Sequence, residues 1–199
     1  MSTRNFLNEH IILDNDRSLL EPLEEKHFPL LWPIAAERAL WQFTQADIKT
    51  EDDFRRYFDK ALQERKEGSS YPFAIYDKQN DCYAGCTRFG NISLRDKRQE
   101  IGWTWYKTSL QRTGINKATK FLLLSFGFEN LELNRIELKT SHLNLKSQGA
   151  MLKIGAVKEG VLRKHSIADN GFVRDTVYFS FIKEEWPEIK NRVFKEFLK

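Results

Sequence analysis

The spacing of hydrophobic and polar positions changes along this chain, and each change of period predicts a change between strand and helix. In the first third, residues 17–21 alternate as in a short strand, and residues 24–36 and 50–67 have helical spacing. The second helix is expected to open at Thr50, an N-cap residue type, and three acidic residues follow it in the first turn. This part therefore predicts one strand and a helical pair.

From Tyr71 onward the period becomes that of strands. Residues 73–77, 82–94 and 100–106 are rich in aromatic and apolar side chains, and turn-forming residues at 77–81 and 95–98 separate them. Short turns of this kind join strands that run in opposite directions, so the middle of the chain predicts an antiparallel meander.

The last part of the chain returns to mixed elements. Helical spacing over 118–129 precedes a strand at 135–140, and a second helix is expected from Asn144 to about Gly155, where glycine suits a left-handed cap. A hairpin of residues 161–167 and 172–182 and a terminal helix from Glu184 complete the pattern. We interpret residues 1–199 as one mixed α/β domain, in which the strand, loop, helix and strand near its middle make a right-handed crossover.

Composition fits a globular protein with room for a cleft. The 199 residues are 41% hydrophobic and 30% charged. The longest apolar runs, such as residues 121–128, are far shorter than the roughly 18 to 20 residues that cross a membrane, and the N-terminus lacks the pattern of a signal peptide. We therefore expect a cytoplasmic protein with no membrane partner.

The charge and the placement of cysteine and histidine argue against some classes of partner and site, but they do not identify one. The 32 basic residues give a net charge of +4 and favour anions in general, but they are interleaved with 28 acidic ones, so a nucleic-acid partner is not expected. Cys82 and Cys86 should share one face of a strand, too close for a disulfide, as reduced packing residues. The four histidines are scattered without metal-ligand spacing, and we expect no metal site.

The most informative segment is the loop from Gln111 to Lys117, with the sequence QRTGINK. It follows a predicted strand and opens a predicted helix, and the N-terminus of a helix carries free backbone N–H groups and a partial positive charge. Phosphate groups bind at such ends, and Gly114 allows the backbone to approach an anion closely. The loop therefore predicts an anion-binding site.

The same residues carry a resemblance to a known family. Gln111, Gly114 and the position of Asn116 resemble the Gln/Arg-x-x-Gly-x-Gly/Ala loop of GNAT N-acetyltransferases, although Asn116 replaces the second small residue. Downstream, Asn144 and Ser147 followed by residues 154–156 resemble the ribosomal-protein N-terminal acetyltransferase branch of that family, as do Gly160 and the segments 175–178 and 185–187. The resemblance covers roughly residues 19 to 186.

The resemblance implies the GNAT acyl-CoA N-acyltransferase fold, with a twisted, mostly antiparallel sheet of about seven strands flanked by helices. The sheet would be splayed between its fourth and fifth strands. Acetyl-CoA would be the co-substrate, with its pyrophosphate on the 112–117 loop and its pantetheine arm paired with the strand at 100–106, because an open strand edge offers N–H and C=O groups to an extended chain. The expected cofactor-binding residues are Trp103, Thr104, Trp105, Gln111, Arg112, Thr113, Gly114, Ile115, Asn116, Lys117 and Asn144.

Two residues are candidates for the chemistry. Glu100 would be the base that takes a proton from the acceptor amine; the alternative is an exposed carboxylate paired with Arg88 or Arg98. Many GNAT enzymes place a tyrosine acid seven positions after the asparagine of the helix motif, but Met151 stands there and cannot donate a proton. The resembled branch implicates Ser147 instead, as a thiol contact or a holder of water, and the alternative for Ser147 and Asn144 is a helix-start role.

Alternatives remain for the function itself. The leading prediction is an N-acetyltransferase acting by direct attack of a primary amine, either a protein N-terminus or a small molecule. A non-catalytic acyl-CoA-binding or sensing module is the alternative that the missing tyrosine allows. The sequence does not name the acceptor or the oligomeric state, although the hairpin and the terminal helix offer surfaces for a homodimer.

Overall fold

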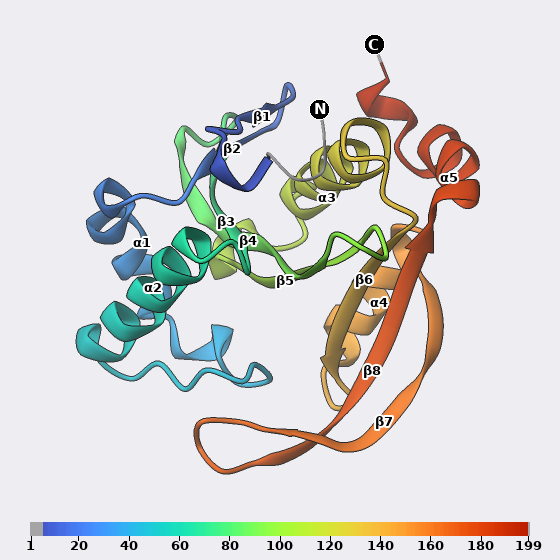
Figure 1. Ribbon diagram of the computed structural model, residues 1–199. Helices are drawn as coiled ribbons and strands as arrows, with labels where there is room; N and C mark the ends of the chain where they lie inside the picture. The colour runs from blue at the N-terminus through green and yellow to red at the C-terminus, as the bar shows by residue number, and fades with distance from the viewer. Residues whose placement is uncertain (1–5, 199) are drawn as a thin grey trace.

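The computed structural model describes residues 6–198, and these residues form a mixed α/β fold around one eight-stranded sheet (Figure 1). The strands are β1 (Leu13–Asp14), β2 (Ser18–Pro22), β3 (Tyr71–Asp77), β4 (Cys82–Ser93), β5 (Arg98–Tyr106), β6 (Arg135–Ser141), β7 (Val157–Ile167) and β8 (Val173–Ile182). The α-helices are α1 (Phe28–Ala35), α2 (Glu51–Lys66), α3 (Ile115–Ser125), α4 (Leu145–Lys153) and α5 (Trp186–Val193). The element order agrees with the sequence pattern, apart from β1, whose two residues are too short to carry a period.

The sheet order is β1-β2-β3-β4-β5-β6-β8-β7, and every neighbouring pair is antiparallel except β5 and β6. The parallel pairing of β5 with β6 lasts for only three residues, Arg98 to Glu100 against Arg135 to Glu137. Beyond Glu100 the two strands separate, so the mostly antiparallel, splayed sheet is confirmed. Eight strands rather than about seven are present within residues 6–198, because β1 is added at the edge.

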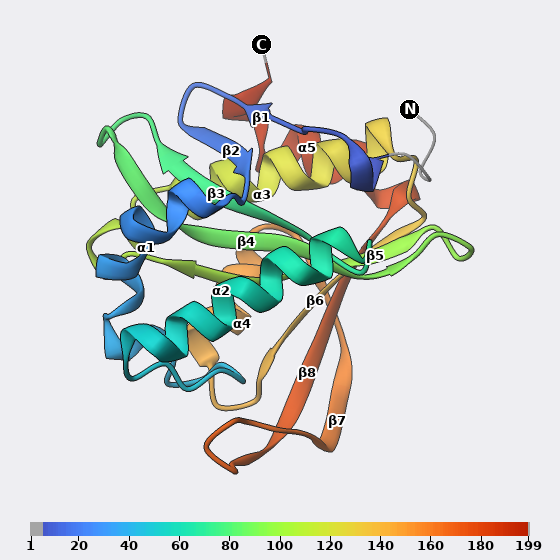
Figure 2. The same cartoon turned by 60° about the vertical axis from the view of Figure 1, so that its left-hand side comes forward.

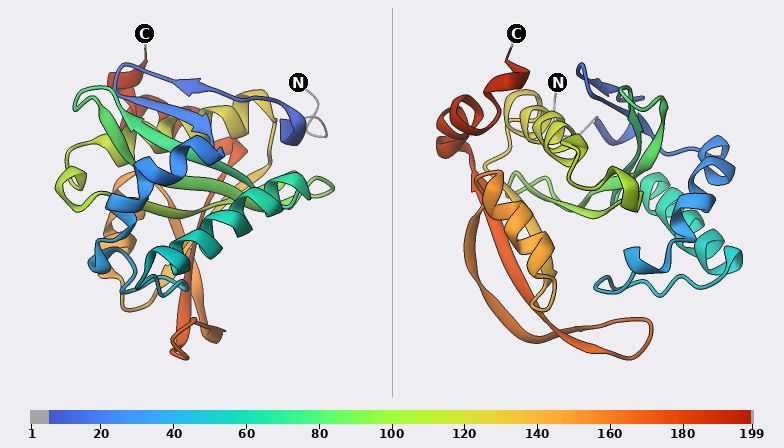
Figure 3. Two further views of the ribbon diagram at one scale, coloured as in Figure 1. Left: turned by 90° about the vertical axis from the view of Figure 1, so that its left-hand side faces the viewer. Right: turned by 180° about the vertical axis from the view of Figure 1, so that it is seen from behind.

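Helices cover both faces of the sheet and create two separate cores. Helices α1 and α2 lie against β3 and β4, whereas α3 packs on the opposite face near β2 (Figures 1 and 2). Seen from behind, α4 lies along β6, and the β7–β8 hairpin curves away from the body toward the loop that follows α1 (Figure 3). The larger core contains Phe89, Leu123 and Phe179, and the smaller one contains Phe54 and Phe58 beneath α2.

Local signals in the sequence account for the ends of the helices. Thr50 caps α2 as expected: its side chain accepts from the Asp53 amide, and the Asp53 side chain accepts in return from the Thr50 amide. Gly155 ends α4 with a φ of +93°, a backbone conformation that favours glycine. The helix expected over 118–129 begins three residues earlier, at Ile115, and continues past Ser125 as a π-helix over Phe126–Asn130.

One prediction about the strands is wrong. Cys82 and Cys86 were expected on one face of a regular strand, but Cys82 packs against the larger core and Cys86 against the smaller one. The cause is a β-bulge: Ile75 pairs with Gly85 and Tyr76 with Tyr83, so Ala84 is an extra residue that reverses the alternation. Both cysteines are free thiols, as expected.

Candidate functional site

The loop before α3 presents a row of free backbone donors. Gly114 has a φ of +97° and Arg112 a φ of +66°, and these two left-handed residues turn the chain sharply into the helix. Between residues 112 and 117, no backbone N–H donates to an acceptor in the described part of the chain; the first amide bonded back to the loop is that of Ala118, at 3.1 Å from the Gly114 carbonyl oxygen. The geometry fits an anion at the helix N-terminus.

Side chains of the loop are largely used to fix its shape. The Gln111 amide donates to the Tyr106 carbonyl at 3.2 Å and accepts from the Lys146 ammonium, so it ties the end of β5 to α4. The Thr113 hydroxyl donates to the Leu110 carbonyl at 2.7 Å. Lys117 forms an ion pair with Glu196. The loop therefore keeps its conformation through side chains while its N–H groups stay available.

Strand β5 leads from the splay of the sheet to this loop. Within the described residues, β5 has no partner on its β6 side after Glu100, so those backbone groups of residues 101–106 that point to this side are open. Trp103 has a φ of +49° and lies at a bulge, where Arg88 pairs with Gly102 and Cys86 with Trp105. An open, bulged edge can pair with an extended amide-bearing chain.

Side chains on β5 differ in accessibility. Trp103 is 36% exposed, its ring lies under the Arg88 guanidinium at 5.0 Å, and Thr104 is half-buried. The Trp105 side chain is buried in the smaller core. Residues 103–105 can therefore offer backbone groups to the open edge, whereas the side chains of Trp103 and Thr104 contact Arg88 and Thr87 on β4.

Glu100 lies at the point where β5 and β6 separate. Its side chain is buried, at 7% exposure, and its Oε2 atom lies 2.7 Å from the Lys139 ammonium and 2.5 Å from the Asn91 amide nitrogen. The expected alternative, an exposed carboxylate paired with Arg88 or Arg98, is wrong. Arg88 pairs with Glu64 instead, on α2, at 2.8 Å.

The surroundings of Glu100 hold its carboxylate in place. Burial acts to lower the pKa of Lys139, but the adjacent Glu100 carboxylate outweighs burial, and the pKa of Lys139 is raised. A Cβ atom at Gly102 would lie 2.8 Å from the Glu100 Oε1 atom, so glycine leaves the carboxylate its position beside the strand. A fixed, buried carboxylate at the splay suits proton transfer.

Ser147 and Asn144 lie together at the start of α4. The Asn144 side chain accepts from the Ser147 backbone N–H at 3.0 Å, so Asn144 is the N-cap of this helix. The Ser147 side chain is half-buried, and its hydroxyl makes no hydrogen bond within residues 6–198. The hydroxyl thus remains available, whereas one of the two polar atoms of the Asn144 amide is committed to the cap.

Lys120 is a buried cation that the sequence pattern did not single out. It is 5% exposed on α3, and its ammonium donates to the Thr104 hydroxyl at 2.9 Å, which in turn lies 2.7 Å from the Thr87 hydroxyl. Burial lowers the pKa of Lys120 from 10.5 to about 7, with the charge of Glu100 acting in the opposite direction. This ammonium lies against β5, one strand position from Trp103.

We expect Lys120→Met to stabilise the protein by about 1 to 4 kcal/mol at pH 6, because the buried charge costs free energy that methionine avoids. Below pH 7 the ammonium is charged in both states, and the cost is complete; between about 7 and 10.5 only the unfolded state stays protonated, so wild-type stability rises with pH. Urea unfolding from pH 6 to pH 10 measures this slope. The slope should flatten in Lys120→Met and persist in Lys60→Met, whose side chain is 76% exposed; equal slopes in all three proteins would contradict the buried charge.

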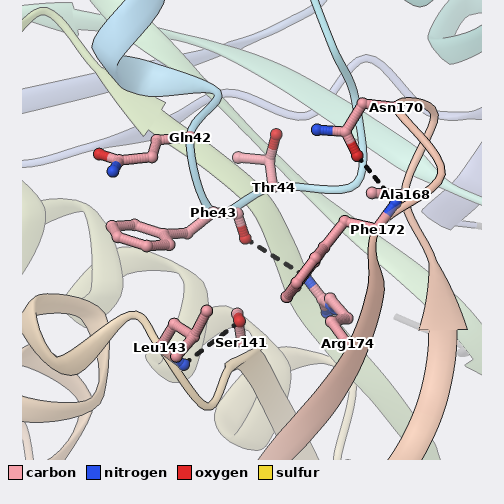
Figure 4. Close-up of a pocket in the computed structure, with 9 residues that line it drawn as sticks. All are labelled: Gln42, Phe43, Thr44, Ser141, Leu143, Ala168, Asn170, Phe172 and Arg174. Carbon is pink, nitrogen blue, oxygen red and sulfur yellow. Dashed lines mark hydrogen bonds between the residues drawn. The ribbon is translucent and has the colours of Figure 1, made fainter.

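A cavity of about 250 Å³ lies between the β7–β8 hairpin and the loop that follows α1 (Figure 4). The loop after α1 contributes Phe43, the end of β6 contributes Ser141, and the hairpin contributes Phe172 and Arg174. Phe43 lines the cavity, whereas Phe54 and Phe58 of α2 are buried in the core.

The sequence pattern missed Asn91, Lys120, Lys139 and Arg174. Lys139 and Arg174 lie on predicted strands, and alternation assigns each side chain to one of the two faces of its strand. Which face borders the splay depends on the partner strands, and the sequence did not show these. Within residues 6–198, no cluster of three or more histidine, cysteine or carboxylate side chains could hold a metal. In the same part of the chain, we find no helix with the length and apolar character needed to cross a membrane.

Comparison with known proteins agrees with this geometry. Residues 17–157 match the protein family described as "Acetyltransferase (GNAT) domain". Because the match covers more than half of the chain, the protein belongs to the GNAT acetyltransferase family, and it has the mixed α/β fold of that family.

Relatives add more detail on the branch. The chain is 28% identical over 183 residues to the Bacillus subtilis protein named "Putative ribosomal N-acetyltransferase YdaF", covering 90% of this chain and 95% of that one. It is 22% identical over 170 residues to an Escherichia coli ribosomal-protein-serine acetyltransferase, covering 83% and 93%. A crystal structure of a GCN5-related N-acetyltransferase from Brucella melitensis superimposes with a TM-score of 0.86 at 26% identity, covering 96% and 86%. The resemblance to ribosomal-protein acetyltransferases is thus confirmed.

Proposed function

We propose that this chain, acting as one domain over residues 1–199, transfers the acetyl group of acetyl-CoA to a primary amine. The observation that carries the proposal is the continuity of three features: the buried carboxylate of Glu100, the open edge of β5, and the free N–H groups of residues 112–117. The three features follow one another along the chain, with the proposed base at one end of β5 and the proposed anion site beyond the other.

The donor would bind along these three features. Backbone N–H groups from Arg112 through Thr113, Gly114 and Ile115 to Lys117 would hold the pyrophosphate, and Asn116 adds a half-buried side chain at the same place. Gln111 would act by fixing the loop. When bound, acetyl-CoA supplies an activated thioester; the backbone of residues 103–105 would pair with its amides and direct an N–H at the thioester oxygen.

Glu100 is proposed as the base. The acceptor amine enters as an ammonium, and the carboxylate would take its proton directly or through one water. The nitrogen then forms a bond to the acetyl carbon as the bond from that carbon to sulfur breaks. The Lys139 ammonium, 2.7 Å from the Glu100 Oε2 atom, holds the carboxylate in position.

Ser147 is proposed to receive the departing thiolate. Its unpaired hydroxyl at the start of α4 can donate a hydrogen bond to sulfur or hold a water that supplies the proton. The amide nitrogen of Asn144, which the cap leaves free, would contact the pantetheine arm. Met151, half-buried further along the same helix, has no proton to give.

The acceptor class is proposed from the relatives. Two of them carry names that describe acetylation of ribosomal proteins, and a free protein N-terminus is a primary amine of the required kind. A small-molecule amine is the other possibility. The second candidate function, a sensing module that binds acyl-CoA without turnover, is supported by the methionine at position 151.

Donor binding can be tested by thermal unfolding. A ligand at about 100 times its Kd, bound only to the folded state, stabilises that state by about 2.7 kcal/mol, so the melting temperature should rise by roughly 5 to 10 °C with acetyl-CoA. Acetyl-pantetheine, which lacks the pyrophosphate, should give a much smaller shift at the same concentration. No shift with acetyl-CoA at millimolar concentration would contradict the donor site.

A further inference from the structure

The cavity beside the hairpin contains a buried arginine with no carboxylate in contact among residues 6–198. Arg174, on β8, is 9% exposed and lines the cavity together with Phe43, Ser141 and Phe172 (Figure 4). Its only hydrogen bond within residues 6–198 joins Nη1 to the Phe43 carbonyl oxygen at 3.3 Å, and its Nε atom is buried without a partner. In the same residues, no carboxylate lies within 4.0 Å of the guanidinium.

An arginine in this state is costly unless something pairs with it. Buried cations are normally matched by an anion or by several hydrogen bonds, and burial lowers the pKa of Arg174, with the charge of Glu100 acting in the opposite direction. One carbonyl contact leaves most of its five donors without a protein acceptor. The cavity therefore carries a positive charge that a planar carboxylate would match in shape and sign.

Two further buried hydroxyl groups lie beside Arg174 in the hairpin. Ser166 is the cross-strand partner of Arg174 on β7, and Thr176 lies two residues further along β8, on the same face as Arg174. The Ser166 Oγ and Thr176 Oγ1 atoms are both buried and have no hydrogen-bond partner within the described residues. Neither hydroxyl lines the cavity, so Arg174 is the one of these three residues that can meet a ligand there.

The tip of the β7–β8 hairpin contacts the loop that follows α1, next to Arg174. The Asp169 backbone N–H donates to the Gln45 carbonyl oxygen at 2.8 Å, and Arg174 bonds to Phe43 in the same loop. These two contacts join segments far apart in the sequence and give the cavity a wall on the side away from β6. A ligand on Arg174 would thus lie inside a bounded site.

Strand β8 connects Arg174 to the proposed reaction centre at Glu100. Tyr178 pairs in register with Lys139, whose ammonium contacts Glu100, and Arg174 lies four residues before Tyr178 on the same face. Four residues of strand span roughly 13 Å. An extended acceptor that lies along β8, with its amine near the Lys139–Glu100 pair, would therefore bring a side chain about three or four residues further along close to Arg174.

We propose that Arg174 binds a carboxylate of the acceptor, and that the acceptor is a peptide N-terminus with an acidic side chain within its first four residues. The inference rests on the proposed acetyl transfer and adds the class of acceptor. The anion belongs to the acceptor because the donor phosphates have their own site on the 112–117 loop. A free amino acid, with amine and carboxylate on one carbon, is too short to span the distance.

The test compares peptides that differ in a single charge. Octapeptides with a free N-terminus and one glutamate at position 2, 3, 4 or 8 are each matched with the glutamine version, and kcat/KM is measured with acetyl-CoA. We expect the wild-type protein to prefer glutamate at position 3 or 4 by about ten- to a hundredfold, as charged hydrogen bonds of this kind provide, and to ignore it at position 8. Free glutamate, as the small-molecule arm, should be a poor acceptor.

Variants then assign the preference to Arg174. In Arg174→Gln the ratio of glutamate to glutamine peptides should fall to about one, and Arg174→Lys, which keeps the charge but loses the planar fork, should retain an intermediate ratio. Lys158→Gln removes one positive charge from an exposed position of the same hairpin and should leave the ratio unchanged. Melting temperatures of all variants are measured alongside.

Failures of the two ideas are distinguishable. If the protein acetylates amines but has the same kcat/KM for glutamate and glutamine peptides, the inference is wrong and the proposed function stands. This comparison uses the wild-type protein alone, so it does not depend on whether a variant folds. Faster acetylation of free glutamate than of any peptide would also overturn the inference. A protein that acetylates no amine contradicts the proposed function, and the inference with it.

Discussion

Replacing Glu100 by glutamine is expected to lower kcat by about a hundred- to ten-thousandfold, the usual contribution of a positioned general base. Glutamine keeps the size of the side chain and can still contact Asn91, but it cannot take a proton from the acceptor. Binding of acetyl-CoA should change little, because Glu100 lies at the thioester end of the proposed donor site and not at the anion site. Steady-state kinetics and a coenzyme titration of the same preparation measure both effects.

Glu137 is the matched control for this substitution. It is the cross-strand neighbour of Glu100 on β6, and its carboxylate pairs with Arg135 at 3.0 Å. Glu137→Gln removes a carboxylate from the same part of the sheet without touching the proposed base, so turnover should stay within a few-fold of wild type. Equal losses in both variants would assign the effect to the sheet rather than to proton transfer, and an active Glu100→Gln with an unchanged pH profile would rule out the base.

Replacing Gly114 by alanine is expected to weaken acetyl-CoA binding by about ten- to a hundredfold. A left-handed conformation costs an alanine about 1 to 2 kcal/mol, so the free N–H groups of the loop would be displaced, and the new methyl group would stand where the anion approaches. Within the described residues no atom lies within 4 Å of the added Cβ, so the protein itself has room for it. Calorimetric titration with coenzyme A measures the change.

Gly171 separates loss of binding from backbone strain. It has a φ of +83° and no heavy atom within 4 Å of an added Cβ, but it lies in the β7–β8 turn, away from the anion site. Gly171→Ala should therefore lose about as much stability as Gly114→Ala and keep its affinity for coenzyme A. Unchanged affinity in Gly114→Ala would show that the loop does not hold the pyrophosphate.

Local signals explain how much of the fold was predictable from sequence. Strand, loop and helix around Gly114 follow one another within about 30 residues, and each carries its own period or cap, as the capping box at Thr50 also does. The splay after Glu100 was predicted through the family resemblance, because no residue type within β5 indicates where the pairing with β6 ends.

Contacts between distant segments explain what the sequence did not show. The partner of Glu100 is Lys139, 39 positions away, and nearer arginines were the natural expectation because register across a splayed sheet cannot be read from either strand alone. The bulge at Ala84 reversed the face of Cys82 without any proline to mark it. Arg174 could not be recognised as a site residue from the sequence, because its contact with the Phe43 carbonyl joins the hairpin to a loop far away in the chain.

The most direct test of acetyl transfer is release of thiol from acetyl-CoA over a panel of amines, followed together with mass analysis of the acceptors. The panel contains peptides with free N-termini, the same peptides with blocked N-termini, and small-molecule amines. We predict thiol and acetylated amine in equal amounts, with free N-termini as acceptors and blocked ones inactive. A protein that binds acetyl-CoA yet releases no thiol with any amine would contradict the transferase and support a sensing module.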